Sequence, residues 1–393
     1  MSNPHVLILP SWYPTGYFPM RGTFFREQAQ ALKEAGCQVG VIYPDFRSLR
    51  SINRGKLLTT RFQRTYRIED GIPTYRVCGW NVISARLRGR LWVNLVKSMW
   101  RAYVAQWGRP DILHAHSVLW GGVAARQLSM QTGLPYVITE HSSGFARSMI
   151  RVWQEPFIED AFTHASATIA VSGALARALS SYLPKGSSDI EIIPNMVDVS
   201  YFSLSPVRAS DGPFRFLTVA FLKKNKGIDT LLRAFTQAFR ERDDVGLEIG
   251  GDGPERRALE RLVQELGIHD RVKFLGYLHR EEVKTAMWRA HAFVLPSYVE
   301  TFGVVLIEAM ATGLPVIATY SGGPEEIVTP QTGILVKPGN VSALAQALWH
   351  VKENREAFPA ETIRTNVVQK YSKTAVVTRL LALYQNILTH QDQ

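Results

Sequence analysis

Short apolar runs alternate with longer stretches of helical periodicity along almost the whole chain. In the first half, buried strands are predicted at 5–10, 39–43, 72–77, 111–115, 136–139, 168–171 and 190–193. In the second half, they are predicted at 214–220, 245–249, 272–275, 292–295, 316–318 and 334–336. Helical periodicity marks residues 23–35, 91–107, 120–131, 156–164, 173–182, 304–311, 343–351 and 374–388. Such alternation of strands and helices predicts an α/β protein with parallel sheets.

Two stretches interrupt this alternation. Residues 46–71 are rich in arginine and show no clear period, so we expect a long loop or a short helical insertion there. Residues 203–213 are polar and irregular, which is typical of a linker. Because 393 residues exceed one ordinary core, the sequence predicts two α/β domains, at 1–205 and 206–373.

The predicted helix at 91–107 carries an apolar stripe close to several basic side chains. Two interpretations stay open. In the first, the stripe packs on the sheet and the arginines are solvated. In the second, this helix and the nearby Arg86, Arg88 and Arg90 lie on an anionic membrane surface.

The stretch from 296 to 324 carries most of the candidate chemistry. A predicted strand ends at Leu295, a short loop carries Glu300 and Gly303, and a helix then begins and contains Glu308. The first N–H groups of a helix lack partners and its dipole is positive there, so this end suits a phosphate. Gly303 lets the backbone come close to a ligand. The alternative is that Glu300 and Glu308 only balance the helix dipole, which would stabilise the helix by about 0.3–1 kcal/mol.

Gly22 ends the loop that follows the first predicted strand, in a strand–glycine loop–helix unit. The loop lacks the G-x-G-x-x-G fingerprint, so a dinucleotide site is not expected. Its aromatic side chains are Trp12, Tyr13, Tyr17 and Phe18. The simpler interpretation is a plain turn whose exposed aromatics close over the sheet.

The spacing of Glu300 and Glu308, ahead of Gly-Leu-Pro-Val and Gly-Gly-Pro-Glu, resembles glycosyltransferase family 4. The resemblance covers nearly the whole chain. It implies a retaining enzyme of the GT-B fold, in which two Rossmann-like domains with parallel sheets face each other across a cleft. The first domain would bind the acceptor and the second the nucleotide sugar. It also implies that the last helix, 374–393, crosses back to the first domain.

The resemblance assigns a role to each candidate in the second half. Glu300 would bond the transferred sugar, Glu308 the ribose hydroxyls, and the N–H groups of Phe302, Gly303 and Val304 the phosphate or sugar. Lys226 would neutralise the leaving diphosphate, and Gly251 would line the nucleotide. The family's phosphate-binding arginine is replaced by Phe221, so Lys223 or Lys224 would supply that charge without the bidentate fork of arginine.

In the first half, His141 matches the family histidine that faces the donor sugar and the acceptor. A neutral histidine can accept a bond from a sugar hydroxyl or carry a proton. His116 is a second candidate for this vicinity, and Gly22 would face the donor phosphates. We expect His114 to be structural, and Glu140 to point to the opposite side of its strand from His141.

Composition and charge limit the classes of molecule that the protein is expected to bind. The net charge is +11, and residues 47–109 hold 14 basic against 2 acidic residues, so the first domain attracts anions. No nucleic-acid reading motif is present, so we expect no nucleic acid as a partner. No Asp-x-Asp and no ligand-spaced His/Cys/Asp cluster occurs, so we expect neither a metal nor a cofactor. The start lacks a signal peptide and no apolar run could span a bilayer.

The resemblance implies a metal-independent hexosyltransferase, and the charge and the chain start predict that it is cytoplasmic and peripheral on the inner face of the plasma membrane. It would move a sugar from a nucleoside-diphosphate sugar to a glycan or lipid-linked acceptor in polysaccharide or lipopolysaccharide biosynthesis. Two alternatives remain: a nucleotide-sugar epimerase of the same fold, and a non-catalytic nucleotide-sugar-binding protein, which Phe221 favours. Retained Glu300, Lys226 and His141 oppose the second alternative.

Overall fold

The computed structural model describes residues 3–16, 21–47, 63–81, 84–183, 189–205 and 212–391. The chain divides into two compact units. Unit 1 comprises Met1–Val171, Leu175–Ile193 and Val376–Gln393, and unit 2 comprises Ser172–Ala174 and Pro194–Ala375. Among the helices that the structure describes, none combines the length and the hydropathy that a bilayer crossing requires.

Unit 1 is built on an eight-stranded sheet of order β3-β4-β2-β1-β5-β6-β7-β8. Its strands are β1 (His5–Pro10), β2 (Gln38–Arg47), β3 (Gln63–Glu69), β4 (Ile72–Trp80), β5 (Ile112–His116), β6 (Tyr136–Glu140), β7 (Ala167–Ala170) and β8 (Glu191–Ile192). Strands β1, β5 and β6 are buried along their whole length, which explains why their sequences show no alternation of apolar and polar positions.

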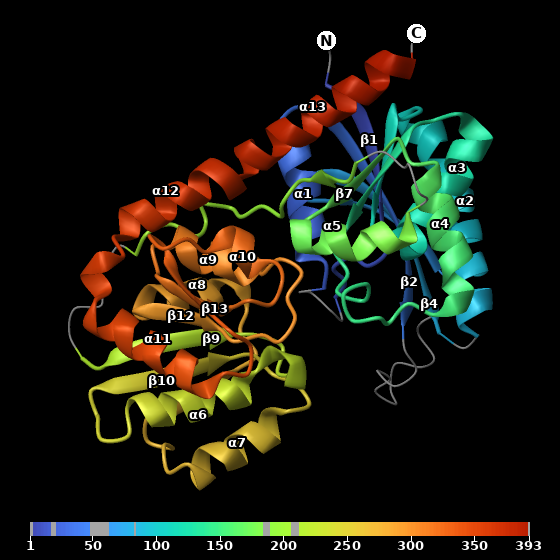
Figure 1. Ribbon diagram of the computed structural model, residues 1–393. Helices are drawn as coiled ribbons and strands as arrows, with labels where there is room; N and C mark the ends of the chain where they lie inside the picture. The colour runs from blue at the N-terminus through green and yellow to red at the C-terminus, as the bar shows by residue number, and fades with distance from the viewer. Residues whose placement is uncertain are drawn as a thin grey trace. The chain divides into compact units, whose positions relative to one another are not determined.

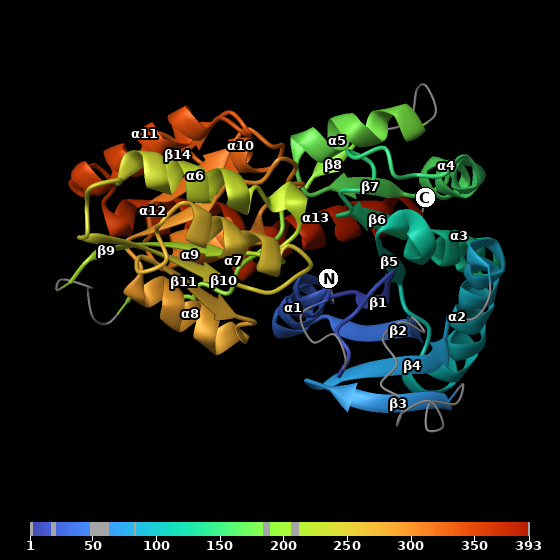
Figure 2. The ribbon, with the colours of Figure 1, turned by 90° about the horizontal axis from the view of Figure 1, so that it is seen from below.

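Helices cover both faces of this sheet. They are α1 (Thr23–Glu34), α2 (Ala85–Trp107), α3 (Val123–Thr132), α4 (Glu155–Thr163), α5 (Gly173–Leu179) and the part of α13 (Lys373–Gln391) that belongs to unit 1. Figure 2 shows α2, α3 and α4 along one face of the sheet, with α1 and α13 against the other.

The expectation of a loop or helical insertion at 46–71 is wrong for its described parts. Strand β2 continues to Arg47, and β3 pairs antiparallel with β4 at the edge of the sheet. Strand β3 is exposed along most of its length, so no burial constraint imposes an alternating pattern on its sequence. Residues 48–62 lie outside the described residues.

Helix α2 starts earlier than predicted, at Ala85, after Ser84 accepts a capping bond from the Leu87 N–H. Its apolar stripe is buried, and the Trp92 indole donates to the Pro44 carbonyl at 3.1 Å. The interpretation in which this stripe packs on the sheet is therefore confirmed. The predicted helix at 120–131 also differs at its start, because Val118–Gly122 forms an irregular turn, with a non-helical backbone at Leu119, before α3.

Unit 2 is built on a six-stranded parallel sheet of order β11-β10-β9-β12-β13-β14. Its strands are β9 (Phe214–Val219), β10 (Val245–Gly250), β11 (Val272–Gly276), β12 (Ala292–Leu295), β13 (Val316–Thr319) and β14 (Gly333–Val336). Its helices are α6 (Ile228–Ala238), α7 (Arg256–Glu265), α8 (Arg280–Arg289), α9 (Val304–Ala311), α10 (Pro324–Ile327), α11 (Val341–Glu353) and α12 (Ala360–Tyr371).

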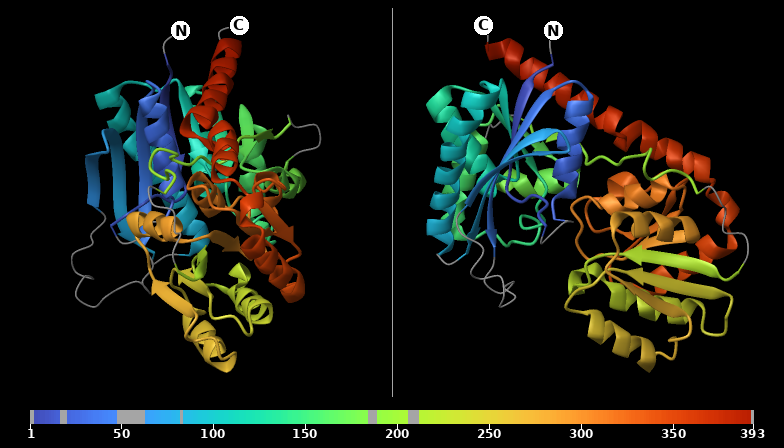
Figure 3. Two further views of the ribbon diagram at one scale, coloured as in Figure 1. Left: turned by 90° about the vertical axis from the view of Figure 1, so that its left-hand side faces the viewer. Right: turned by 180° about the vertical axis from the view of Figure 1, so that it is seen from behind.

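In unit 2 the helices again form two layers. Figure 1 shows α6 and α7 on one side of the sheet and α8 and α9 on the other, and Figure 3 shows the same layers from behind. Helix α11 packs beside α6, and α12 beside α9. The predicted fold class, an α/β protein of two domains with parallel sheets, is therefore confirmed, with β3 as an antiparallel addition.

The long segment of unit 2 begins at Pro194, ahead of the predicted boundary between residues 205 and 206. The segment after Pro194 is held to the end of the same unit. Val197 forms a bridge with Ser372, Asp198 pairs with Lys373 at 2.8 Å, and the Arg364 guanidinium donates to the Val199 carbonyl at 2.8 Å. Residues 206–211 of the predicted linker lie outside the described residues.

Candidate active site

In unit 2, the strand order reverses between β9 and β12. From β9 the chain continues to β10 on one side, whereas from β12 it continues to β13 on the other side. Loops that leave two such strands diverge, and ligands of open α/β sheets bind in the crevice at their carboxyl ends. The two loops meet at this point, where the Tyr298 N–H donates to the Asn225 carbonyl at 2.9 Å.

This meeting point brings Lys226 and Glu300 together. Lys226 Nζ donates to Glu300 Oε2 at 2.6 Å, and the two side chains are 22% and 15% exposed. Gly227 makes the approach possible. Its φ is +65°, and a Cβ there would lie 2.1 Å from the Pro296 carbonyl oxygen. Residues 74 positions apart in the sequence thus form a partly buried ion pair at the switch point.

The backbone of Glu300 is fixed from the other side by the turn after β13. The Glu300 N–H donates to the Ser321 carbonyl at 2.9 Å, and the Glu300 carbonyl accepts from the Gly323 N–H at 2.7 Å. A Cβ on Gly323 would lie 2.2 Å from the Phe302 Cα, so this turn requires glycine. The conspicuous Gly-Gly pair of the sequence therefore serves to position the Glu300 loop.

Helix α9 begins directly after this loop. Gly303, with φ of +98°, is its N-cap, and the helix is anchored by buried Leu306 and Ile307. Glu308 is half-buried and follows Val304 by four residues, so both lie on the same side of the helix. The predicted candidates Phe302, Gly303, Val304 and Glu308 therefore share one loop and one helix start with Glu300.

Gly251 lies where three strands of unit 2 end. Its φ is +117°, and a Cβ would lie 1.9 Å from the Ala220 carbonyl oxygen. Its N–H donates to the Gly276 carbonyl at 2.7 Å. Glycine is required there by the close approach of the β9 and β10 ends, so its occurrence does not by itself indicate a ligand.

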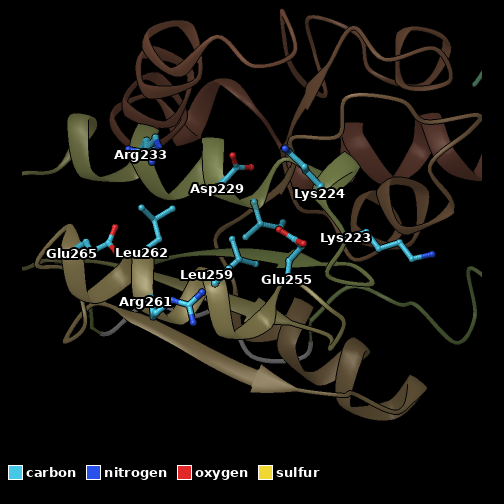
Figure 4. A pocket seen from close by; sticks show the side chains of 11 residues that line it. Lys223, Lys224, Asp229, Arg233, Glu255, Leu259, Arg261, Leu262 and Glu265 are labelled. Atoms are coloured by element: carbon cyan, nitrogen blue, oxygen red, sulfur yellow. The ribbon is translucent and has the colours of Figure 1, made fainter.

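Lys223 and Lys224 contribute to a different feature of unit 2. Both line a cavity of about 270 Å³ between α6 and α7, together with Asp229, Arg233 and Glu255, among others (Figure 4). In Figure 4 Lys223 extends away from this cavity. Its ammonium lies 4.9 Å from the ring centroid of Phe221, which is 57% exposed. The structure thus brings Lys226 to Glu300 and places the two neighbouring lysines elsewhere.

In unit 1, the corresponding reversal of strand order lies at β1, between β2 and β5. The loops after β1 and β5 are joined by Ser11, whose hydroxyl donates to the Ser117 carbonyl at 2.9 Å and accepts from the Gly121 N–H at 3.0 Å. Gly22, with φ of +77°, is the N-cap of α1, and a Cβ there would lie 3.0 Å from the Trp12 ring.

The aromatics of this glycine loop are not a uniform exposed group. Tyr13 is 2% exposed and lies under the Arg76 guanidinium, 5.1 Å away, so the interpretation as exposed aromatics is wrong for Tyr13. The Trp12 ring lies 5.3 Å from that of Phe25. Tyr17 and Phe18 lie outside the described residues.

Three histidines form a buried cluster at the ends of β5 and β6. His116 Nδ1 and His141 Nε2 are 3.1 Å apart, and the Phe25 ring stacks on His116 at 4.6 Å. His114 Nδ1 lies 2.5 Å from the Tyr384 hydroxyl, and its Nε2 lies 2.7 Å from the Thr139 hydroxyl. The structure therefore couples the two candidates His116 and His141, while His114 has the structural surroundings that we expected.

Burial keeps His114 and His116 uncharged. It lowers the pKa of His114 from 6.5 to about 3. Burial, together with the neighbouring His114 and His141, also lowers the pKa of His116 well below its ordinary value. Among the described residues, Nε2 of His116 is buried and has no hydrogen-bond partner. His116 is thus a neutral imidazole, and its Nδ1 shares a hydrogen bond with His141 Nε2.

Glu140 is the residue that sequence reasoning missed. Its buried carboxylate accepts from the N–H groups of Val118, His141 and Ser142 and from the Ser117 hydroxyl, at 2.7–2.9 Å. Burial raises the pKa of Glu140 and these four bonds oppose the rise. Glu140 therefore joins the loop after β5 to the loop that carries His141. An acid at the end of a buried strand, with serines in both following loops, was the available signal.

Across the described ranges, no group of three His, Cys, Asp or Glu side chains gathers in a way that could hold a metal ion. The arrangement instead offers one ammonium, one carboxylate and the start of a helix in unit 2, and neutral imidazoles in unit 1. Such groups suit the binding of an anion and of hydroxyl groups.

Comparison with known families now identifies the class of protein. Residues 22–201 match the model of the family described as Glycosyltransferase Family 4, and residues 204–366 match that described as Glycosyl transferases group 1. The chain therefore belongs to these glycosyltransferases, with its two halves matching the two families in order.

Curated relatives resemble the chain at moderate identity. The phosphatidylinositol N-acetylglucosaminyltransferase gpi3 subunit of Schizosaccharomyces pombe is 29% identical over 52% of this chain and 45% of its own length. A Homo sapiens protein named for the same transferase is 31% identical over 50% of this chain and 41% of its own length. The chain thus spans less than half the length of these two relatives. A putative teichuronic acid biosynthesis glycosyltransferase of Bacillus subtilis is 27% identical over 87% of this chain and 88% of its own.

Solved structures share the fold over the whole chain. Sucrose-phosphate synthase from Thermosynechococcus elongatus superposes with a TM-score of 0.79 at 24% identity, covering 99% of this chain and 100% of that one. Anabaena HepE in complex with UDP and glucose superposes with a TM-score of 0.73 at 21% identity, covering 98% and 100%. At these identities the likeness establishes the GT-B type of fold.

Proposed function

We propose that the chain is a retaining, metal-independent glycosyltransferase that moves a hexosyl group from a nucleoside-diphosphate sugar to an acceptor hydroxyl. The observation that carries this proposal is the Lys226–Glu300 pair, 2.6 Å apart at the point where the β9 and β12 loops diverge. A partly buried ammonium beside the start of α9 is a site for a diphosphate. The adjacent carboxylate is a site for sugar hydroxyls.

Each residue of unit 2 has a distinct task in this proposal. Lys226 and the first N–H groups of α9 balance the negative charge that develops on the leaving diphosphate. Glu300 accepts hydrogen bonds from the transferred sugar, and Glu308, one turn into α9, accepts them from the ribose. These groups take the place of a metal cation, and no cofactor takes part.

The reaction then needs no side-chain nucleophile. The bond from the anomeric carbon to the diphosphate breaks while the acceptor oxygen attacks from the same face, and a phosphate oxygen receives the acceptor proton. In unit 1, His141 bonds a sugar or acceptor hydroxyl as a neutral imidazole, and its bond to His116 holds the ring in place.

Similar proteins support the substrate classes. The Anabaena structures contain UDP or UDP-glucose, which supports a nucleotide-sugar donor. Relatives named for phosphatidylinositol and teichuronic acid, and a fold neighbour named as a lipopolysaccharide outer core galactosyltransferase, support a lipid-linked or surface-glycan acceptor. We propose that the protein works in the cytoplasm, peripherally at the inner face of the plasma membrane.

The test is release of nucleoside diphosphate from a panel of sugar nucleotides, with and without a lipid extract as acceptor. We expect release that depends on both substrates. Glu300→Gln and Lys226→Ala should each lower turnover at least about tenfold, which is ~1.4 kcal/mol of barrier. Lys273→Ala, which changes an exposed lysine on β11, is the matched control. Wild-type turnover in both site variants would contradict the assigned roles.

Exposed Phe221, in the place of the family arginine, favours a second candidate function, a non-catalytic nucleotide-sugar sensor. Such a protein would bind the donor without turnover across the whole acceptor panel. An epimerase would instead convert the sugar nucleotide with no acceptor present, and chromatography of the nucleotide fraction separates these outcomes.

A further inference from the structure

Unit 1 carries exposed apolar side chains that neither its core nor its candidate site uses. They are Leu87 on the first turn of α2, Met149 and Val152 in the segment before α4, and Phe157 on α4. Their exposed fractions are 55%, 59%, 79% and 38%. Isolated exposed apolar residues are ordinary, so the question is whether these belong to one surface.

Ring contacts join the segments that carry these side chains. The Trp120 ring lies 6.1 Å from the Trp153 ring and 5.9 Å from the Phe157 ring. The start of α2 joins them from the other side, since the Arg86 guanidinium lies 5.5 Å from the Trp153 ring and Gly89 leaves room for Trp120. The start of α2, Trp120 and residues 149–157 therefore form one continuous surface, here called the α2–α4 surface.

The charge of the α2–α4 surface has one sign where the apolar side chains are most exposed. Arg86 and Arg90 on α2, and Arg147 and Arg151 beside Met149 and Val152, are all exposed. No acidic residue occurs in 84–101 or in 141–154. The acids of α4 begin at Glu155, and Asp160 is paired with Arg126 at 3.3 Å.

We propose that the α2–α4 surface docks on the headgroup region of an anionic lipid bilayer. Arginines attract anionic headgroups and keep their charge in water while their stems lie along apolar surface. Tryptophan rings favour the membrane–water interface, and the apolar side chains of Val152 and Met149 can insert at the same depth. The buried stripe of α2 takes no part in this contact, because it packs on the sheet.

This proposal rests on the membrane location within the proposed function but not on sugar transfer, so failure of membrane binding and failure of the transferase assignment can be distinguished. Full-length protein is floated with vesicles of pure phosphatidylcholine or of phosphatidylcholine with phosphatidylglycerol, at about 0.1 and 0.5 M salt. We expect binding to the anionic vesicles alone, and less of it at high salt because the charges are screened.

Two pairs of variants locate the contact. R86Q with R151Q should lower the partition constant more than about tenfold, since each arginine near the surface contributes about fivefold, ~1 kcal/mol. M149S with V152S should lower it at both salt concentrations. The matched controls are R101Q with R177Q and M130S, which change exposed residues elsewhere on unit 1 and should float like the wild type.

Three outcomes would overturn the proposal. The wild type could fail to float with anionic vesicles, which would leave a protein partner as the occupant of this surface. The site variants could float as well as the wild type, or the control variants could lose as much binding as the site variants. Circular dichroism of every variant separates loss of binding from loss of fold.

Discussion

Mild acid should destabilise unit 1 through its buried histidines, and His114 allows the size of the effect to be worked out. Burial lowers the pKa of His114 from 6.5 to about 3 in the folded chain. Below pH 6.5 the exposed histidine of the unfolded chain binds a proton that the folded chain does not bind. The stability is therefore present above pH 6.5 and is lost as the pH falls towards 3.

The loss amounts to about 1.4 kcal/mol for each pH unit within that window. Acidification from pH 6.5 to about 5.0 thus removes about 2 kcal/mol through His114 alone. His116 adds a loss of the same sign, because its pKa is lowered well below 6.5. His114→Gln still offers a hydrogen-bond acceptor to the Tyr384 hydroxyl. This variant should lose the part of the acid-induced destabilisation that His114 causes and keep the part that His116 causes.

Hydrogen exchange of the β5 amides is the appropriate assay, because it reports unit 1 separately from unit 2. Protection is measured for the wild type and His114→Gln at pH 7.5, 6.5 and 5.0, after correction for intrinsic exchange. His350→Gln, which changes an exposed residue of α11 in unit 2, is the control. The reasoning would be refuted by equal loss of protection in the wild type and His114→Gln, or by no loss at all.

Two further predictions concern the loops of unit 2. Gly227→Ala places a methyl group against the Pro296 carbonyl and strains a left-handed residue by about 1–2 kcal/mol, so sugar transfer should fall at least about tenfold. Gly267→Ala, with nearly the same φ but open space around it, is the control, and equal activity of the two variants would contradict the prediction. Phe221→Arg should tighten binding of a nucleoside diphosphate about tenfold or more in calorimetry, because a charge-assisted hydrogen bond contributes about 1.5–3 kcal/mol. Unchanged affinity would show that position 221 does not face the phosphates.

The elements that the sequence predicts best are those whose bounds follow from a local pattern of apolar residues and glycines. Strand β12 and helix α9 have the predicted bounds, since an unbroken apolar run and a glycine-bounded helix each leave one interpretation. Strand β3 could not be recognised, because an exposed edge strand needs no apolar face. The start of α2 was missed because its first turn is exposed and held by the Ser84 cap rather than by an apolar stripe.

The candidate site shows the same division. The approach of Lys226 to Glu300 could be expected in part, since their loops leave neighbouring strands, β9 and β12, at the same edge of the sheet. The different environment of Lys223 and Lys224 could not, because side chains only two or three residues before Lys226 leave the β9 loop in different directions. Nor could the role of Glu140 be derived from strand alternation, which gives the direction of a side chain but not the loop amides that it meets.

The bond between His114 and Tyr384 joins residues 270 positions apart within unit 1. A ribosome that makes the chain from its amino end produces β5 early and Tyr384 among the last residues. The face of the sheet that α13 covers must therefore stay open to water, or to a chaperone, during the whole synthesis of unit 2. Unit 1 is first in translation, yet its interior is closed last, and a stop codon in the final turns of α13 would damage the fold of the opposite end of the chain.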